Sequence, residues 1–201
     1  VIDLQSGATA RLQSVKGLGN GNINLSGDLQ LSGAQGTMEN RLEGTGIVSL
    51  TNGSNVGFSA DNADFSGSIH IGSGTTLSAT SDSQLGTATV TNEGNLVLHS
   101  DDDWKFDNVM NGSGKLVKEG EGIVRISSEY AHEGGTEIMH GSLVMDGLSS
   151  ALSGSGDVRI AEGASLGGYG LIGGNVINQG ILAAGSGMAV LTKGTGTLTI
   201  S

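Results

Sequence analysis

The 201-residue chain contains no proline and no cysteine, and aromatic side chains make up only 3% of it. Without cysteine there is no disulfide framework and no thiolate metal site. The absence of proline is typical of a fold in which most strands have a neighbour on both sides, because proline cannot donate a hydrogen bond to the ladder. Basic residues are also few: 9 Lys and Arg stand against 20 Asp and Glu, for a net charge of −11. We therefore expect no nucleic-acid partner, since nucleic acid requires a basic footprint.

Long apolar segments are missing too. No run approaches the roughly 20 apolar residues of a membrane helix. The first residues, Val1 to Leu4, are not the basic start of a signal peptide. If the protein is exported, we expect these residues to be part of a longer precursor. The charge is uneven along the chain, because Lys193 is the only charged residue after Glu162.

What the sequence does contain is 37 glycines and many short apolar pairs, each closed by a turn signal within about ten residues. Most pairs have the period-2 spacing of a strand, so that Ile69 and Ile71 should face inward and His70 outward. This pattern predicts an all-β fold, a right-handed parallel β-helix with three strands and some 20 to 24 residues per turn. Roughly nine turns at ~4.8 Å spacing would give a rod on the order of 45 Å long. The near-neutral stretch 163–201 is expected to cap its C-terminal end.

Two blocks, 67–71 and 134–138, look alike and lie 67 positions apart. We interpret this distance as about three turns of the coil. No composition shift indicates a linker, so we expect one continuous domain. Within it, 1–110 is predicted to form the shaft and 111–201 the C-terminal turns.

Two glycine motifs match catalytic or cofactor patterns by chance. The G-x-G-x-x-G match at 168–173 is followed by a strand and turn pattern, and no acid lies downstream of it, so no dinucleotide site is expected. The G-x-S-x-G match around Ser165 has no acid or histidine after it, so the hydrolase triad cannot be assembled in its usual order.

Acidic and aromatic residues give further candidates. Asp101 to Asp103 could hold calcium, but consecutive acids on a strand alternate sides and cannot all face one ion. The four histidines lack metal-site spacing. Polysaccharide-cleaving β-helices are a serious comparison, with Asp101–Asp103 and Glu119/Glu121 as candidate stacked acids. Trp104 and Phe106 are expected to form a buried plug at one end and not a sugar platform. We expect no catalytic residues, no cofactor and no metal.

A series of motifs runs through the second half of the chain in a fixed order. They are Gly112-Ser-Gly114-Lys-Leu116-Val-Lys118-Glu-Gly120-Glu-Gly122-Ile123, Gly134-Gly-Thr136-Glu-Ile138, Gly141-Ser-Leu143, Ser153-Gly-Ser-Gly156-Asp-Val158, Ala164-Ser-Leu166-Gly-Gly-Tyr-Gly170, Gly174-Asn-Val176-Ile-Asn178-Gln-Gly180-Ile-Leu182 and Gly196-Thr-Leu198-Thr-Ile200. In this order they make 60–201 resemble the C-terminal passenger region of bacterial autotransporters, especially the self-associating, AIDA-type adhesins. Two positions depart from the family pattern: Ala183-Ala184-Gly185 stands where Pro-Gly is usual, and His132-Glu133 replaces small or aromatic residues.

The resemblance implies a passenger that crosses the periplasm and the outer membrane of a Gram-negative bacterium and remains at the cell surface or is secreted. Its partner in transit would be the outer-membrane β-barrel translocator of its own precursor. The last turns would act as an autochaperone, folding first and templating the rest. We expect this nucleating core to comprise Ile123, Ile126, Ile138, Leu143, Val158, Leu166, Val176 and Leu182.

The function implied is that of a structural adhesin segment, mediating adhesion, autoaggregation or biofilm formation. Self-association would use outward ladders such as Thr87, Thr89, Thr91 and Asn92, with weak contacts multiplied over many copies. Two alternatives stay open. The segment could be the stalk of a passenger that recruits a host protein, as the actin-nucleating type does. It could also support a protease or polysaccharide-degrading activity located upstream.

Overall fold

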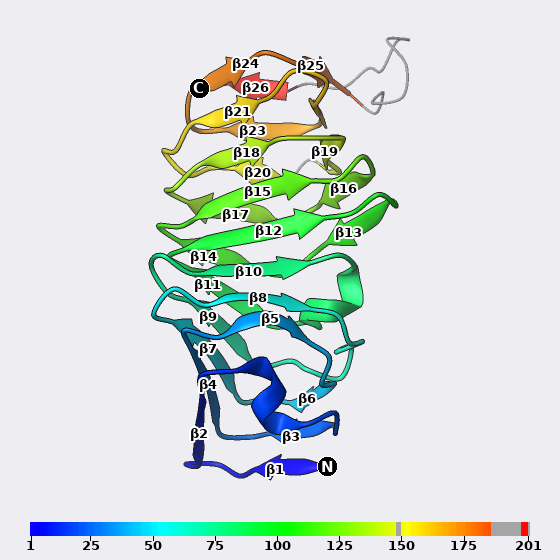
Figure 1. Cartoon of the computed structure of the whole chain (residues 1–201). Helices are drawn as coiled ribbons and strands as arrows, with labels where there is room; N and C mark the ends of the chain where they lie inside the picture. Colours follow the sequence, from blue (N-terminus) through cyan, green and yellow to red (C-terminus); the bar gives the residue numbers. More distant parts are fainter. Residues whose placement is uncertain (148–149, 186–197, 201) are drawn as a thin grey trace.

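The computed structural model describes residues 1–147, 150–185 and 198–200, and in it the chain forms a parallel β-solenoid (Figure 1). Every pairing between the named strands is parallel. In Figure 1 the front strands run from left to right, and the chain returns behind them as it rises, so the coil is right-handed. The predicted parallel β-helix is confirmed.

One face of the coil is a ten-stranded sheet with one strand from each turn, so the chain completes nine turns along it. In spatial order its strands are β2 (Thr9–Leu12), β4 (Asp28–Ser32), β7 (Ile47–Thr51), β9 (Ser68–Ile71), β11 (Thr89–Asn92), β14 (Met110–Gly112), β17 (Glu129–His132), β20 (Ala151–Leu152), β23 (Gly170–Ile172) and β26 (Leu198–Ile200).

The second face, at the front of Figure 1, is an eight-stranded sheet. Its strands are β5 (Gln35–Met38), β8 (Asn55–Phe58), β10 (Thr76–Ala79), β12 (Asn95–His99), β15 (Lys115–Glu119), β18 (Thr136–Ile138), β21 (Val158–Ile160) and β24 (Val176–Asn178). The 3-10 helix η1 (Val15–Leu18) contacts β5, the first strand of this sheet.

The third face consists of two sheets with an interruption between them. The N-terminal sheet contains β1 (Ile2–Leu4), β3 (Ile23–Leu25) and β6 (Leu42–Gly44). The C-terminal sheet contains β13 (Trp104–Phe106), β16 (Ile123–Ile126), β19 (Ser142–Met145), β22 (Ser165–Gly168) and β25 (Ile181–Ala184). In the turn before β13 the chain forms the 3-10 helix η2 (Asp82–Leu85) in place of a strand.

Most turns have the expected 20 to 24 residues, and the first two are one residue shorter. Paired residues on the ten-stranded sheet lie 19 positions apart at Thr9 and Asp28, and 22 apart at Tyr130 and Leu152. The final interval, from Gly170 to Leu198, is 28 positions and includes the undescribed 186–197. The predicted boundary between 110 and 111 falls inside β14, which pairs with both β11 and β17, so the coil continues through it.

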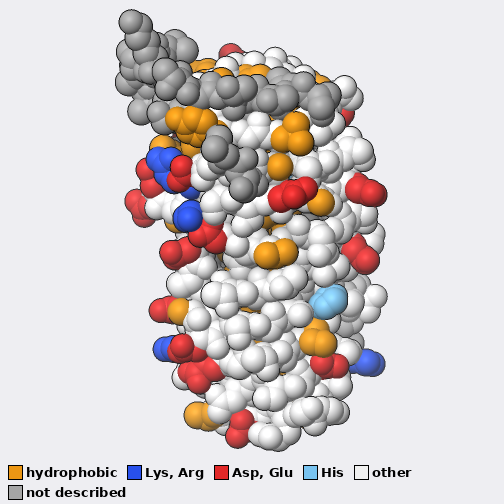
Figure 2. Space-filling model, turned by 180° about the vertical axis from the view of Figure 1, so that it is seen from behind, with side chains coloured by type: hydrophobic (Ala, Val, Ile, Leu, Met, Phe, Trp, Pro, Cys, Tyr) orange, Lys and Arg blue, Asp and Glu red, His pale blue; other side chains and the backbone are white. Residues whose placement is uncertain are grey.

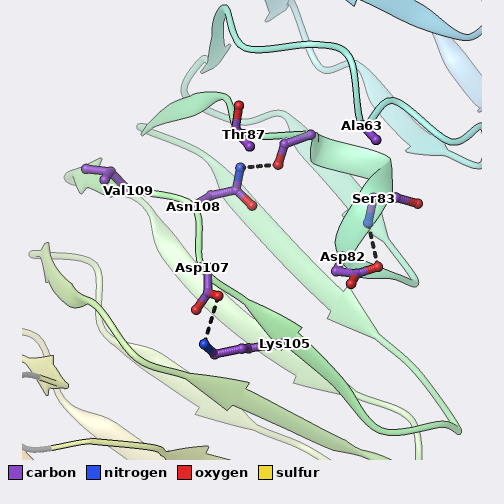
Figure 3. Close-up of a pocket in the computed structure, with 9 residues that line it drawn as sticks. Ala63, Asp82, Ser83, Thr87, Lys105, Asp107, Asn108 and Val109 are labelled. Atoms are coloured by element: carbon purple, nitrogen blue, oxygen red, sulfur yellow. Dashed lines mark hydrogen bonds and ion pairs between the residues drawn. The ribbon is translucent and has the colours of Figure 1, made fainter.

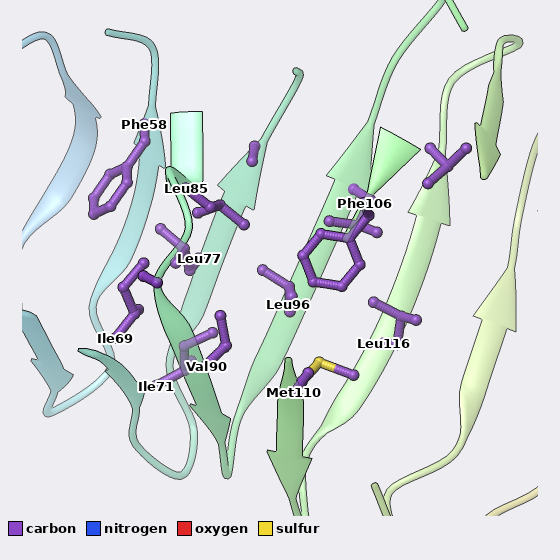
Figure 4. Packing of buried hydrophobic residues seen from close by; sticks show 14 of the residues in the cluster. Phe58, Ile69, Ile71, Leu77, Leu85, Val90, Leu96, Phe106, Met110 and Leu116 are labelled. Atoms are coloured by element: carbon purple, nitrogen blue, oxygen red, sulfur yellow. The ribbon is translucent and has the colours of Figure 1, made fainter. Parts of the chain in front are cut away.

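The hydrophobic core is a column of inward side chains that lie in register from turn to turn, part of which Figure 4 shows. Along the ten-stranded sheet it contains Ala10, Leu29, Val48, Ile69, Val90, Met110, Tyr130, Leu152 and Ile172. Ile69 and Ile71 are buried and His70 is exposed, as the period-2 spacing predicted. Burial of these side chains is the main stabilising contribution, since each Å² of apolar surface removed from water contributes about 25 cal/mol.

Three aromatic side chains, Trp104, Phe106 and Tyr130, form a cluster in the middle of the coil. Phe106 stacks on Tyr130 with ring centroids 5.4 Å apart, and Trp104 meets Phe106 edge-on at 6.5 Å. The Tyr130 hydroxyl donates to the Phe106 carbonyl over 2.6 Å. The expected end plug was therefore wrong in position, because β13 is the first strand of the C-terminal part of the third face and has turns on both sides of it.

Glycines let successive turns approach at one corner of the coil. A Cβ added at Gly67 would lie 2.0 Å from the Gly46 carbonyl oxygen, and one at Gly46 would lie 2.3 Å from that of Gly27. No side chain fits at such distances. Glycine is therefore required at this corner because successive turns lie in contact, and not because the backbone adopts a positive φ.

The resemblance between 67–71 and 134–138 does not reflect a three-turn repeat. Strand β9 belongs to the ten-stranded sheet, whereas β18 belongs to the eight-stranded sheet. Similar Gly-rich turns before a pair of apolar residues occur on different faces, because each face has the same inward and outward alternation.

Candidate functional site

The broadest candidate surface is the outward side of the ten-stranded sheet. Its central row pairs polar side chains from one turn to the next: Arg11, Gln30, Ser49, His70, Thr91 and Asn111. Figure 2 shows the molecule from this side, with charged side chains mainly along the margins. Hydroxyl and amide groups at a regular spacing can exchange hydrogen bonds with another extended surface, each contributing little alone.

The residues expected on that surface are placed as follows. Thr87 and Thr89 are exposed and Thr91 is half-buried. Asn92 was predicted to face outward, and this was wrong. It is the fully buried last residue of β11, where its side-chain amide group donates to the Lys115 carbonyl over 2.9 Å and accepts from the Gly94 N–H over 3.1 Å. A buried asparagine satisfies the backbone groups of a tight corner that no strand can pair.

The expected nucleating core is largely buried. Ile126, Ile138, Leu143, Val158 and Leu166 are at most 1% exposed, and Val176 and Leu182 pack against the core while partly exposed. Leu143, Leu166 and Leu182 stack in one column across β19, β22 and β25.

Ile123 does not belong to this core. It is half-buried, whereas its neighbours Val124 and Ile126 are fully buried. Side chains alternate along a strand, so Ile123 and Ile126, three positions apart, cannot both face inward on β16. The prediction for Ile123 was wrong, and Val124 is the inward residue that it missed.

The acidic triplet ties two turns together. The Asp101 carboxylate accepts from the Glu121 amide over 3.1 Å, and that of Asp103 accepts from the Ile123 amide over 3.0 Å. The Asp102 carbonyl accepts from the Ser100 hydroxyl over 2.7 Å. These carboxylates thus replace missing strand pairing at a corner. Among the residues described, no group of three or more His, Asp or Glu side chains could hold a metal ion.

Lys118 is an unusual buried cation at the adjacent corner. Its Nζ donates to the carbonyls of Glu119 and Gly120 over 2.7 Å each and to that of His140 over 3.3 Å. Burial lowers the pKa of Lys118, and the nearby carboxylates, led by Glu121, oppose that shift.

The histidines lie apart from one another. His99 and His140 are exposed beside Glu119 and Glu121, at 3.5 and 3.9 Å. His132 is buried at the end of β17, where Nε2 lies 3.0 Å from the Gly135 carbonyl and 2.9 Å from the Thr136 hydroxyl. Nδ1 has no partner among the described residues. Burial lowers the pKa of His132.

The two glycine motifs lie in strands and turns of the coil and form no catalytic or cofactor site in the described residues. The 168–173 match spans β22 and β23, and β24 follows it, so no helix N-terminus is available for a phosphate. The Ser165 hydroxyl lies 2.8 Å from that of Ser142 in the preceding turn and 3.5 Å from the Gly141 carbonyl. Neither partner is a general base.

A cavity of about 420 Å³ lies where the third face is interrupted, and sequence reasoning missed it (Figure 3). One wall is η2 with the following Gly86 and Thr87, and the other is the segment 105–109. Lys105 and Asp107 form an ion pair across 3.0 Å, and Asn108 donates to the Gly86 and Ala88 carbonyls. The available signal was Ser81-Asp-Ser-Gln84, which breaks the alternation of the neighbouring turns.

In the described part of the chain, no helix has the length and apolar character needed to cross a membrane.

Comparison with known proteins gives two relatives, both from Escherichia coli strain K12. The chain is 32% identical to "Uncharacterized lipoprotein YdeK" over 181 residues, which cover 90% of the chain and 13% of that protein. It is 40% identical to "Uncharacterized protein YuaQ" over 106 residues, which cover 52% of the chain and 8% of that protein. The chain therefore spans only a small part of the length of either relative. No protein-family model matches the chain, and no solved structure does.

Proposed function

We propose that this chain is a non-enzymatic shaft segment of a long cell-envelope protein, displayed at the cell surface as the passenger of a self-associating adhesin autotransporter is. The observation that carries the proposal is the in-register column of inward side chains, which runs without a break from Ala10 on β2 to Ile172 on β23. Each turn contacts only its neighbours, so such a coil can extend over any length and act as a spacer.

Two further observations support a place in the cell envelope. The chain matches 13% of a protein whose name is that of a lipoprotein, and lipoproteins are anchored to membranes by their acyl chains. The motif series that resembles the passenger family also falls on consecutive turns of the coil, from β15 to β25. The proposed surface exposure and secretion by an autotransporter route depend on this resemblance.

In this proposal the C-terminal turns fold first outside the outer membrane, after passage through the barrel of the same precursor. Starting a coil is unfavourable because the first turn has no folded neighbour, whereas each later turn adds its side chains to an existing column. The stacked Leu143, Leu166 and Leu182 provide the first such column. Adhesion follows from the polar row on the ten-stranded sheet, whose weak contacts are multiplied by many copies on a cell.

Surface display tests the folding part. In the full precursor, Ile138→Asp places a carboxylate in the core, since Ile138 is fully buried. Burying an unpaired charge is strongly unfavourable, so we expect display and protease resistance to fall sharply. Met139→Asp is the matched control, because Met139 is the adjacent residue and is 42% exposed. Equal display of both variants would contradict a nucleating role for this column.

Cell clumping tests the adhesive part. Thr89→Glu adds a charge to the outward side of the ten-stranded sheet without touching the core. We expect cells displaying this variant to clump less at low salt, because identical faces that approach each other would then repel. Unchanged clumping would exclude this face. Recruitment of a host protein without clumping, or turnover of an acidic polysaccharide, would favour the corresponding alternative function.

A further inference from the structure

The cavity beside η2 has the chemistry of a binding site for a cationic side chain, and this inference is independent of the shaft and adhesion proposal. It lies at the one place where the third face changes from one sheet to the next. There η2 contacts β13 without pairing to it as a strand. The irregular backbone leaves a depression of about 420 Å³, within the range of pockets that hold small ligands.

Asn108 supplies the first observation that points to a ligand. It is only 7% exposed, and its Nδ2 donates to the carbonyls of Gly86 over 3.0 Å and Ala88 over 2.8 Å. These two bonds fix the orientation of the amide. In Figure 3 its oxygen points into the space between Asp107 and η2, and among the described residues it accepts no hydrogen bond. Because this oxygen is open to the cavity, a donor that enters the cavity can bond to it without displacing a partner within the chain.

The other polar groups of the cavity also offer acceptors. Asp82 uses Oδ1 to accept from the Ser83 amide over 2.7 Å, which leaves Oδ2 available. Thr87 adds a hydroxyl, and Asp107 is already neutralised by Lys105 at 3.0 Å. The cavity therefore has one unpaired carboxylate and a fixed amide oxygen, on a chain of net charge −11. Its complement is a group with several donors and a positive charge.

We propose that this cavity binds an arginine side chain presented by an extended segment of a partner protein. A guanidinium has five donors in a planar fork and can reach a carboxylate and an amide oxygen at once. Its aliphatic stem would lie along Val109, which is 57% exposed at the rim of the cavity, and Ala63. A neutral sugar fits less well, because none of the residues lining the cavity is aromatic.

The test uses the 15N-labelled protein and the tripeptide acetyl-Gly-Arg-Gly-amide, followed through amide chemical shifts. We expect saturable shifts at Ser83, Thr87 and Val109 that weaken at high salt. The same peptide with citrulline, which keeps the shape and removes the charge, should bind at least roughly tenfold more weakly.

Two variants and a control locate the site. Asp82→Asn keeps the oxygen that accepts from Ser83 and removes the charge, so affinity should fall roughly tenfold. Glu93→Gln makes the same charge change at an exposed position that does not line the cavity, and it should leave affinity unchanged. Thr87→Val removes a hydroxyl from the cavity and should weaken binding several-fold. If Asp82→Asn changes chemical shifts throughout the protein, which would indicate altered folding, the affinity of Thr87→Val serves as the test in its place.

Three results would overturn the inference: no saturable shifts at the cavity, equal binding of the arginine and citrulline peptides, or an equal loss in Glu93→Gln. Saturable shifts at the same residues with methyl glucoside and not with the arginine peptide would also overturn it, and would assign the cavity to a sugar.

Discussion

The inward side of β16 offers a sharp test of the register, because neighbouring residues have opposite expected effects. Val124 is fully buried, and its partners in the adjacent turns are Trp104 and Leu143. Ile123 is the larger side chain but is half-buried on the outward side. The two substitutions to compare are Val124→Ala and Ile123→Ala.

The magnitude follows from burial. Val124→Ala removes two methyl groups from the core, about 1.6 kcal/mol of transfer free energy. The cavity left between two fixed neighbours raises the expected loss in the free energy of unfolding to about 2–3 kcal/mol. Ile123→Ala removes more carbon from a partly hydrated site, and its expected loss is under about 1 kcal/mol.

Thermal unfolding followed by circular dichroism measures the difference. For a chain of this size 1 kcal/mol shifts Tm by roughly 2–4 °C, so Val124→Ala should lower Tm by about 5–10 °C. Because each turn contacts only its neighbours, hydrogen-exchange protection should fall in β13, β16 and β19 while β4 and β7 keep theirs. An Ile123→Ala loss equal to or larger than that of Val124→Ala would refute the register of this strand.

Two other substitutions test the corners of the coil. His132 is buried and burial lowers its pKa, so its protonation favours the unfolded chain. Its contribution to stability is present above the unfolded pKa of about 6.5 and is lost as the pH falls below it. Urea unfolding from pH 7 to 5 should therefore lose stability faster in the native protein than in His132→Phe, and parallel pH profiles would show that His132 does not titrate this way. Gly67→Ala would place a Cβ 2.0 Å from the Gly46 carbonyl oxygen and should lower the free energy of unfolding by about 1–3 kcal/mol. In the control Gly21→Ala the Cβ would lie 3.4 Å from the nearest atom, so this variant should be nearly neutral. Similar Tm values for the two variants would disprove the close approach of the turns.

Several features of the fold could be predicted from local pattern because they depend only on a strand's own residues. The alternation of Ile69, His70 and Ile71 needs no knowledge of the partner strand, and it was confirmed. Ile123 failed because it lies three positions before Ile126, so the alternation along β16 places the two side chains on opposite sides and makes Val124 the inward residue. Asn92 failed for the same reason: it directly follows the outward Thr91, so it shares the inward side of β11 with Val90, and there its amide bonds to backbone groups of the corner.

The cavity could not be predicted because it arises from two segments, 82–87 and 105–109, that belong to successive turns of the coil. Asp82 and Asn108 are both ordinary turn residues in sequence, and neither belongs to a known motif. They line one cavity only because η2 replaces a strand in one turn and β13 follows in the next.

The sequence by itself determined that this chain is a coil of short strands. The absence of proline, the glycine-closed apolar pairs and the period-2 spacing are local properties, and they leave few other folds open. Only the tertiary structure decided which faces the strands occupy, which polar residues are buried at the corners and where the third face is interrupted. Those outcomes depend on how each turn stacks on its neighbour, and the length of one turn changes the register of the next.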